Sequence, residues 1–583
     1  MRRVPLLLAA LLAPVVPAVV AAPAYAADNV ICVGNAAGPC DQTAVSIDAA
    51  NLVADGNGVA DTIRIGTGTW TEPALYFNGS ADPLTIEGSG PDTVVTLAPG
   101  PIEQYIRLDG AWLRNLTVRL EPTTSSNDKG VVAFNGATVE NVRVDGTGTS
   151  NATAMQVSGS TVLGADIEMP LGGGSRGFFT EGGATVFDSA VVADSGLVHS
   201  GASTTDVVQR STFAVGSTVG LSTDSGTVLV DNSVIDLGTG GGTGLRALNY
   251  NASTSPRSIV ADHVTIVGGN ASSRGVWAYA ASPTVAQSST VTLLSSIVRG
   301  SGTSLVTDAG NNGPPLGASN ATIAVRYSDY QTTGGTIGTN GVGEVVDNGG
   351  NVIDVDPLFV DVAGGDFHLS PESPLIDAGD PEDLGTLADI DGTLRPVDGD
   401  SDGTAVTDVG ADEYVDTTAP DTEIVGGPPG LTNEAAPTFS FTSEPGASFA
   451  CKVDGDPWAS CTSPHATQPL TDGPHTFAVR ATDPAGNTDP TVATRDFRVD
   501  TTPPQTRLSD HPPRPTTKRK VRFAFTSEKG AIFACNLDRT GWKACTSPRT
   551  YRVPKGWHRF WVMAVDKAGN NDPTPATFRF RRR

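Results

Sequence analysis

The sequence predicts an all-β protein in which a right-handed parallel β-helix precedes two β-sandwich domains. Three observations support this prediction. Short apolar strands led by glycine recur between residues 60 and 330, a unit of 84 residues is repeated near the C-terminus, and glycine (67) and proline (41) are abundant. We expect a signal peptide over 1–26, the β-helix over 27–415, and sandwiches over 416–499 and 500–583.

The β-helix prediction depends on a loose repeat. Each copy has a Gly-led turn, a strand, a small polar step and a second strand, as in Gly136–Val144 and Gly226–Val234. Alternation places Val, Leu and Ile on one face of each strand, and one such rung cannot bury that face alone. Stacked rungs would share one apolar column. A β-sandwich is the alternative, although it predicts more even spacing. The polar steps are Asn115, Asn141, Ser189, Ser211, Asn232, His263 and Ser295.

The N-terminus is typical of an exported protein. Arg2 and Arg3 precede a short apolar run, Leu6–Val20, and Ala24–Ala26 offers a small-residue cleavage site. Later in the chain the sequence has no apolar run long enough for a membrane span. We therefore expect a secreted protein that is either released or held at the cell surface by non-covalent contacts.

The six cysteines fall into three local pairs. An even count in an exported chain indicates disulfides, each worth roughly 2–3 kcal/mol on the chain-entropy model. Zinc is the alternative, but the pairs lack the short spacings and histidine partners of zinc sites. The pairs are Cys32 with Cys40, Cys451 with Cys461, and Cys535 with Cys545.

The segment 348–414, called the terminal segment below, is dense in motifs. It contains Leu358-Phe359, Ser373-Pro-Leu-Ile-Asp-Ala-Gly379, Arg395-Pro396 and Asp408-Val-Gly-Ala-Asp-Glu413. These motifs closely resemble the terminal region of bacterial surface β-helix proteins of the choice-of-anchor group, Q type. The resemblance implies that this segment ends the β-helix and precedes anchoring or adhesive modules. It implies a location more than a chemistry.

Two repeated units follow the terminal segment. Phe441–Cys451 recurs as Phe525–Cys535, and Trp458 recurs as Trp542. Alternating strands and an Asp-x-Ala-Gly-Asn turn in each unit fit a β-sandwich. The units resemble the immunoglobulin-like (Ig-like) repeats of bacterial exported proteins. Their cysteines lie only ten residues apart, so we expect each pair to link one hairpin and not the two sheets.

One acidic run has the spacing of a calcium loop. Asp398, Asp400 and Asp402 alternate before Gly403 and can converge oxygens on Ca²⁺. The position where an EF-hand needs a bidentate Glu is Val409, so we expect Asp408 or Glu413 to complete a structural site. A solvated acidic turn is the alternative. The weaker run Asp55–Gly58 is expected to be an entry turn.

Catalysis on the β-helix is the main alternative function. We expect Asp188, Asp231 and Asp262 to stack at the same step of successive rungs, where paired carboxylates could hydrolyse a glycan. Asp262 and His263 form a lyase-like pair, but they occupy an ordinary rung position. No nucleophile elbow or ordered triad is present in the sequence. The sequence therefore favours a scaffold for adhesion or glycan binding over a polysaccharide lyase or glycoside hydrolase.

Charge is distributed unevenly along the chain. Residues 501–583 carry 18 Lys plus Arg against 5 Asp plus Glu, a net of +13, whereas the whole chain carries −25. A basic end on an acidic body suggests capture of an anionic cell-envelope polymer or polysaccharide, and the extracellular setting argues against nucleic acid. The alternative is a solubilising charged face. The residues expected to bind the anionic surface are Arg514, Lys518, Arg519, Lys520, Arg522, Arg581, Arg582 and Arg583.

Overall fold

The computed structural model describes most of the chain from residue 29 onward. The described ranges are 29–54, 59–80, 82–99, 103–122, 128–201, 204–250, 255–282, 285–310, 319–336, 341–383, 388–400 and 404–583. The predicted signal peptide, the Asp55–Gly58 run and Asp402 lie outside them. The described chain forms two compact units, the first ending at Val415 and the second spanning Asp416–Arg583. Among the described residues, no helix is long and apolar enough to cross a membrane.

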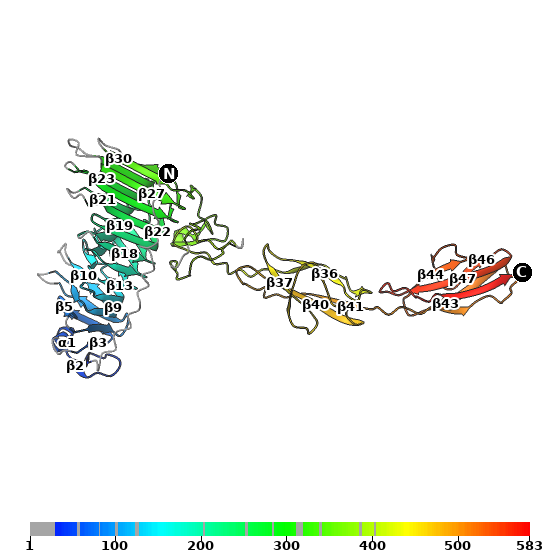
Figure 1. The fold of residues 1–583 in the computed structure, drawn as a ribbon. Coiled ribbons are helices and arrows are strands. Elements are labelled where there is room, and N and C mark those ends of the chain that lie inside the picture. Colours follow the sequence, from blue (N-terminus) through cyan, green and yellow to red (C-terminus); the bar gives the residue numbers. More distant parts are fainter. Residues whose placement is uncertain are drawn as a thin grey trace. The chain divides into compact units, whose positions relative to one another are not determined.

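The first unit is a parallel β-helix, which confirms the predicted fold class. In the described residues of this unit, 31 strands pair in parallel, coil upon coil, and wind around one apolar column (Figure 1). A complete coil contributes one strand to each of three faces. Face 1 contains β5 (Leu75–Asn78), β8 (Ile106–Asp109), β10 (Lys129–Phe134), β12 (Thr153–Val157), β15 (Arg176–Thr180), the ends of β17 (Ala190–His199) and β19 (Thr212–Thr223), β21 (Thr243–Asn249), β23 (Arg274–Ala281), β26 (Thr303–Gly310) and β29 (Thr333–Gly334).

Faces 2 and 3 are formed by the other strands of the same coils. Face 2 contains β1 (Asn29–Val33), β2 (Gln42–Ala44), β3 (Asp61–Ile65), β6 (Leu84–Gly88), the starts of β9 (Trp112–Leu120) and β11 (Thr138–Asp145), β13 (Thr161–Leu163), β16 (Thr185–Phe187), β18 (Thr205–Gln209), the starts of β20 (Thr227–Asp236) and β22 (Arg257–Val267), β24 (Ser288–Leu294), β27 (Ser319–Arg326) and β30 (Gly341–Asp347). Face 3 contains β4 (Gly68–Glu72), β7 (Thr93–Leu97), β14 (Asp166–Glu168), β25 (Ile297–Val298), β28 (Asp329–Tyr330), β31 (Val352–Ile353) and the remaining halves of β9, β11, β17, β19, β20 and β22.

Helix α1 (Ile47–Ala54) belongs to the first coils. Ser46 begins the helix by accepting the backbone N–H of Ala49 at its Oγ, 3.1 Å away. Ile47, Ala50 and Ala54 are buried and join the same apolar column as the strands. The helix therefore extends the core at the N-terminal end of the β-helix.

A column of left-handed residues separates face 2 from face 3. One residue per coil has a positive φ there, which favours Asn, Asp or Gly over most side chains. We call this column the lateral bend. It consists of Asn115, Asn141, Gly164, Asp188, Arg210, Asn232, His263, Ser295, Tyr327 and Gly350.

Five of the predicted polar steps are residues of the lateral bend: Asn115, Asn141, Asn232, His263 and Ser295. In two other coils the predicted position is wrong by one residue. There the left-handed residues are Asp188 and Arg210, not Ser189 and Ser211. Ser189 and Ser211 are buried one position later. Their hydroxyls accept backbone N–H groups of the preceding coil, from Ala165 and Ser189 respectively, each at 3.2 Å. The two serines thus form part of an internal ladder.

The terminal segment leaves the last coil and packs beside the β-helix. It contains the antiparallel pair β32 (Phe359–Asp361) and β33 (Asp366–Leu369), with the 3₁₀ turn η1 (Val362–Gly364) between them. Leu375, Ile376 and Val409 form a small core with Ile297 of β25. The segment therefore folds back onto the side of the coils from which it emerges.

The second unit contains two sandwiches with the same plan. The first pairs β34 (Glu423–Gly426), β36 (Thr438–Thr442) and β39 (His465–Ala466) against β35 (Leu431–Thr432), β41 (Ala493–Val499), β40 (Gly473–Thr482), β37 (Ser448–Val453) and β38 (Ala459–Cys461). The second pairs β42 (Arg507–Asp510), β43 (Lys520–Thr526) and β46 (Arg549–Arg552) against β45 (Lys543–Cys545), β44 (Ile532–Leu537), β47 (Gly556–Val565) and β48 (Ala576–Arg582). Stacked phenylalanines fill both cores.

All three predicted disulfides are confirmed. Cys451–Cys461 and Cys535–Cys545 each join neighbouring antiparallel strands, so they link a hairpin within one sheet, as expected. Cys32–Cys40 closes a loop that follows β1 in the first coil. The described residues hold no free cysteine, in agreement with an oxidising compartment.

Candidate functional site

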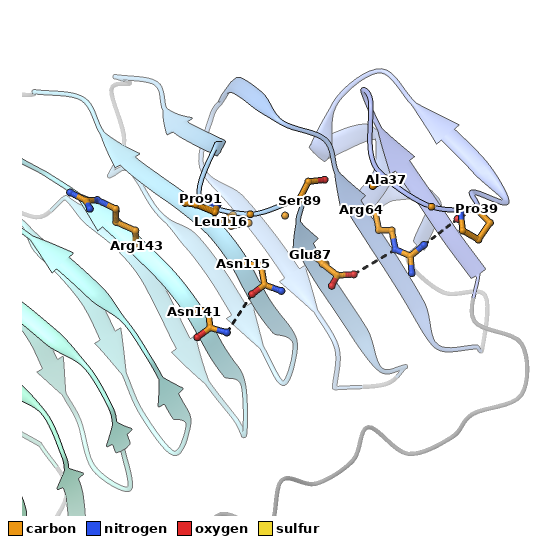
Figure 2. A pocket seen from close by; sticks show the side chains of 13 residues that line it. Ala37, Pro39, Arg64, Glu87, Ser89, Pro91, Asn115, Leu116, Asn141 and Arg143 are labelled. Carbon is orange, nitrogen blue, oxygen red and sulfur yellow. Dashed lines mark hydrogen bonds and ion pairs between the residues drawn. The ribbon is translucent and has the colours of Figure 1, made fainter. Parts of the chain in front are cut away.

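A groove opens along the edge between face 2 and face 3 in the first coils, and its far end includes the first residues of the lateral bend, Asn115 and Asn141. It has a volume of about 700 Å³ and is shown in Figure 2. Strands β3, β6, β9 and β11 form its floor, because each contributes the residues at or beside its bend. The groove is lined by Ala37, Gly38, Pro39, Arg64, Glu87, Gly88, Ser89, Gly90, Pro91, Asn115, Leu116, Asn141 and Arg143.

The disulfide loop forms one wall of this groove. Cys32–Cys40 holds Ala37, Gly38 and Pro39 over the edge of face 2. The Arg64 guanidinium donates to the Pro39 carbonyl oxygen at 3.2 Å, which ties the loop to β3 (Figure 2). The first coil therefore shapes the groove through a covalent link and a hydrogen bond.

Ion pairs between coils fix the charged side chains of the groove. Glu87 lies 3.5 Å from Arg64 and 3.3 Å from Arg114, so one carboxylate joins three neighbouring coils. Arg143 pairs with Asp166 at 3.0 Å and also contacts Glu168. Paired in this way, the groove presents oriented polar groups without a large excess of either charge.

The two asparagines of the bend form an amide ladder. The Nδ2 of Asn141 donates to Oδ1 of Asn115 at 3.4 Å (Figure 2). The left-handed backbone at both residues turns these amides toward the groove instead of into the column. Each amide has donor and acceptor capacity beyond this one bond. A ligand rich in hydroxyl groups would find both kinds of partner here.

A second, smaller groove lies on face 1 of the same coils. Its volume is about 460 Å³, and Tyr105, Arg107, Phe134 and Gln156 are among its lining residues. The Arg107 guanidinium lies 4.3 Å from the centre of the Phe134 ring and 5.4 Å from that of Tyr76. Aromatic and polar surface therefore occurs together on this face.

The predicted stack of three carboxylates is wrong for Asp188. Asp231 and Asp262 do lie opposite each other on β20 and β22, but Asp188 lies on the bend itself. The Asp188 carboxylate accepts two hydrogen bonds from Arg210, at 2.7 and 2.8 Å. The residue in register with Asp231 on the preceding coil is Gln209.

The remaining pair, Asp231 and Asp262, is buried. Their residues are only 2% and 7% exposed. Burial, and next the charge of Asp262, raise the pKa of Asp231 well above its ordinary value. Nδ1 of His263 lies 3.1 Å from Oδ1 of Asp262 and 3.8 Å from Oδ2 of Asp383, which belongs to the terminal segment. The lyase-like pair is therefore enclosed between two parts of the first unit.

Arg395 holds the terminal segment over these acids. Its Nε donates to Oδ1 of Asn232 on the bend at 3.0 Å, and its Nη1 pairs with Glu413 at 2.8 Å. Its other guanidinium hydrogens reach the backbone carbonyls of Asp408 and Gly410. Both charged side chains are almost completely buried. This part of the bend is a packed interface, in contrast with the open groove.

The predicted calcium ligands do not all come together. Asp398 and Asp400 lie near Asp377, with one carboxylate oxygen of each within 4.8 Å of the others. Asp408 is instead buried, and its carboxylate accepts the backbone N–H groups of Asp377 at 2.7 Å and Tyr414 at 2.6 Å. Asp377 was not predicted as a ligand, although it belongs to the motif Ser373–Gly379.

The carboxylate of Asp377 already accepts three backbone hydrogen bonds. It accepts backbone N–H groups from Gly399 and Asp400, and also from Val406. Burial raises the pKa of Asp377. The residue organises the acidic turn, and calcium at this turn stays a prediction.

The residues predicted to bind an anionic surface lie on more than one side of the second sandwich. Lys520 and Arg522 point outward from β43 in one sheet, where Arg522 pairs with Asp510 at 2.6 Å. Arg581 points outward from β48 in the other sheet. Arg582 donates to the Val553 carbonyl, and the Arg514 guanidinium lies 3.8 Å from the centre of the Phe578 ring.

Comparison with known proteins identifies part of the second unit. Residues 421–501 match the model of the bacterial Ig-like domain. The match covers the first sandwich, which agrees with the Ig-like repeats expected from the sequence. No curated protein sequence is similar to this chain.

Several solved structures are similar to the chain at low identity. Pectate lyase Pel9A is 14% identical, over 67% of this chain and 97% of that one, with a TM-score of 0.36. The catalytic domain of a GH87 α-1,3-glucanase in complex with nigerose is 14% identical, over 52% and 67%, with a TM-score of 0.33. Fibronectin(III)-like modules of Clostridium thermocellum CbhA are 16% identical, over 28% and 94%, at 0.21. Scores this low say nothing about activity.

Proposed function

We propose that this chain is an extracellular scaffold that binds a glycan in the groove of Figure 2 without cleaving it. The observation that carries the proposal is the groove itself, an open trough of about 700 Å³ along stacked coils whose lining combines polar and apolar groups. Its size is typical of sites for small ligands or short segments of a polymer. A trough open at its surface suits a chain-like saccharide better than an enclosed cofactor.

The groups in the groove suit hydroxyl recognition. The amides of Asn115 and Asn141 offer paired donors and acceptors, while Arg64 and Arg143 offer planar donors. Cross-coil ion pairs hold the charged groups in place before a ligand arrives. Preorganisation of this kind lowers the entropic cost of binding.

The same groove lacks the groups that hydrolysis needs. A glycoside hydrolase uses two carboxyl groups, one on each side of the scissile bond. Among the described lining residues, Glu87 is the one carboxylate, and two arginines pair with it. Binding without cleavage is therefore the function that this arrangement supports.

Catalysis is the second candidate, and one observation favours it. The adjacent carboxylates of Asp231 and Asp262, with a raised pKa at Asp231, resemble the unequal pair of an acid–base mechanism. The terminal segment lies over this pair, so a glycan could reach it only if that segment moved. This arrangement makes a structural role the better explanation.

Location and attachment complete the proposal. Three disulfides fit an extracellular protein, and the predicted signal peptide over 1–26 would account for export. The terminal segment would place the chain among surface proteins of the choice-of-anchor type. We propose that the second unit contributes adhesion and that Ca²⁺ at Asp398 and Asp400 is structural.

The proposal can be tested by a binding measurement on the full chain. Asn141→Gly removes an amide but keeps the left-handed backbone, since Gly164 holds the equivalent position in the next coil. We expect affinity for the best glycan of a neutral and uronate panel to fall about three- to tenfold, the value of one hydrogen bond.

The matched control is Asn320→Ala, which removes an exposed amide from β27 on face 2, far along the coils. It should leave affinity unchanged. Equal affinity of the wild type, Asn141→Gly and Asn320→Ala chains would contradict binding in the groove, and so would the absence of any bound glycan.

A further inference from the structure

The outer face of β47 and β48 in the second sandwich alternates aromatic and cationic side chains. Phe560, Val562 and Phe580 point into the core, so the residues between them point outward. Register places Trp557 opposite Arg581, Arg559 opposite Arg579, and Trp561 opposite Thr577. We call the five outward residues the Trp–Arg ladder: Trp557, Arg559, Trp561, Arg579 and Arg581.

The arginines of the ladder lie close to its tryptophan rings. The Arg579 guanidinium carbon lies 4.5 Å from the centre of the Trp557 ring, and that of Arg581 lies 6.0 Å away on the same indole. Arg559 lies 4.9 Å from the centre of the Trp561 ring, and its Nε donates to the Thr577 hydroxyl at 3.1 Å. Each arginine thus lies within cation–π distance of an indole on the same sheet face.

Within residues 404–583, all of which are described, the guanidinium groups of the three arginines form no ion pair with a carboxylate, although the backbone N–H of Arg559 donates to Asp538. Ion pairs in this sandwich involve other groups, such as Arg522 with Asp510. Trp557 is 60% exposed, a high value for the largest apolar side chain. One exposed indole, one half-buried indole and three guanidinium groups without ion pairs on one sheet face indicate a surface suited to an anionic partner.

The first sandwich has different residues at the positions equivalent to the Trp–Arg ladder. By the register of β40 with β41, Pro474, Thr476 and Ala478 stand where the second sandwich has Trp557, Arg559 and Trp561. Asp496 stands in place of Arg579, and its carboxylate accepts a hydrogen bond from the Thr476 hydroxyl at 2.7 Å. The fold therefore does not require the ladder, because the same strands form without it.

We propose that the Trp–Arg ladder binds an acidic polysaccharide, a sugar chain that carries carboxylate, sulfate or phosphate groups. Guanidinium groups take such anions in paired hydrogen bonds, and indole faces take the apolar faces of sugar rings. Trp557 and Trp561 are four residues apart, so their rings span roughly 13 Å along the strand, enough for more than one sugar. The basic charge of residues 501–583, net +13, attracts such a polymer from a distance.

This inference goes beyond the proposed function, since it assigns a second ligand to a different unit. A chain could lose glycan binding in the Figure 2 groove and keep the ladder, or the reverse. Variants in the two places therefore test the two proposals separately.

The test uses the full chain with polygalacturonate and dextran sulfate as probes, and single-stranded DNA as a competitor class. Trp557→Ala leaves the charge unchanged and should weaken polygalacturonate binding about tenfold, the value of a well-formed cation–π and stacking contact. The double variant Arg579→Ala/Arg581→Ala should weaken it at least as much.

The matched control is Lys520→Ala/Arg552→Ala. It removes the same two charges from a neighbouring pair on the other sheet, and should change affinity less than about threefold. Equal losses in both double variants would overturn the proposal in favour of general charge attraction. Unchanged binding by the Trp557→Ala chain, or tighter binding of DNA than of either polysaccharide, would also overturn it. All substituted side chains are exposed, so melting temperatures should stay constant.

Discussion

The lateral bend serves two different purposes in the two halves of the β-helix. In the first coils, Asn115 and Asn141 face an open groove and bond to each other. In later coils, Asn232 occupies the same left-handed position but accepts a hydrogen bond from Arg395 beneath the terminal segment. The left-handed backbone favours Asn, Asp or Gly at this column without requiring them, and the segment that covers the column decides whether a side chain is available to a ligand.

The difference explains why the acids of the β-helix are not an obvious active site. Asp231, Asp262 and His263 lie in the covered half, where the partners are other parts of the chain. The open half offers amides and paired charges instead. The proposed binding groups and the buried acids therefore lie in different halves of the β-helix, and the following changes would break or sharpen that separation.

The largest expected effect comes from Arg395, which bonds the terminal segment to the β-helix. Arg395→Met would leave the buried Glu413 carboxylate and the Asn232 amide without their partner, at a cost of about 3–5 kcal/mol in the free energy of unfolding. Hydrogen exchange across 388–400 and 404–414 should accelerate accordingly. Glycan affinity of the groove should not change.

Arg143→Met is the corresponding control, because Arg143 is an ion-paired arginine on the open half. Its exposed pairs should contribute less than about 1 kcal/mol. If the two variants destabilised the chain equally, the distinction between a covered and an open half would be wrong.

The disulfide of the first coil should have the next largest effect. Cys32→Ser/Cys40→Ser should cost roughly 2–3 kcal/mol and should also lower glycan affinity, because the loop that carries Pro39 walls the groove. Cys451→Ser/Cys461→Ser should cost a similar amount of stability. A loss of glycan affinity in the second variant would contradict the placement of the site.

Calcium should act only on the covered half. If Ca²⁺ binds near Asp377, Asp398 and Asp400, a tenfold excess over its Kd should stabilise the first unit by about 1.4 kcal/mol, seen as a higher melting temperature. Asp398→Asn/Asp400→Asn should remove the shift. If Ca²⁺ does not change the melting temperature of the wild-type chain, the predicted calcium site would be contradicted.

The smallest effect concerns His368 of the terminal segment. Burial alone would lower its pKa, but hydrogen bonds to Asp366 and Asp391 outweigh burial and raise the pKa from 6.5 to about 9. Because the folded pKa is the higher one, this stabilisation is complete below pH 6.5 and is lost as pH rises through about 9.

The side chain of His368 is 45% exposed, so solvent screening should keep the contribution below about 1 kcal/mol. His368→Gln should flatten the pH dependence of the melting temperature over this interval. An unchanged dependence would show that these hydrogen bonds do not persist in solution.

Local sequence pattern was sufficient to predict the architecture. Strand alternation, the repeated Phe-Thr-Ser-Glu unit and the cysteine spacing depend on residues close in the chain, and the structure confirms the fold and the disulfides. The one-residue error at Ser189 and Ser211 arose because Arg210 is an unusual left-handed residue and because its ion pair with Asp188 forms only between coils.

Long-range contacts were not predictable in the same way. Arg395 donates a hydrogen bond to Asn232, which lies 163 positions earlier in the chain, and the sequence around either residue does not indicate that contact. The motif residues Asp377, Asp408 and Glu413 turn out to hold the terminal segment together through backbone and ion-pair contacts. The groove was missed because Arg64 and Glu87 meet only after the coils stack.

The fate of a bound glycan tests the central claim most directly. The full chain would be incubated with its best glycan, and new reducing ends and unsaturated products would be measured over time, with Asp262→Asn and Asn141→Gly chains in parallel. We predict an intact glycan in every case and weaker retention only by the Asn141→Gly chain. Cleavage by the wild-type chain that Asp262→Asn abolishes would contradict the account.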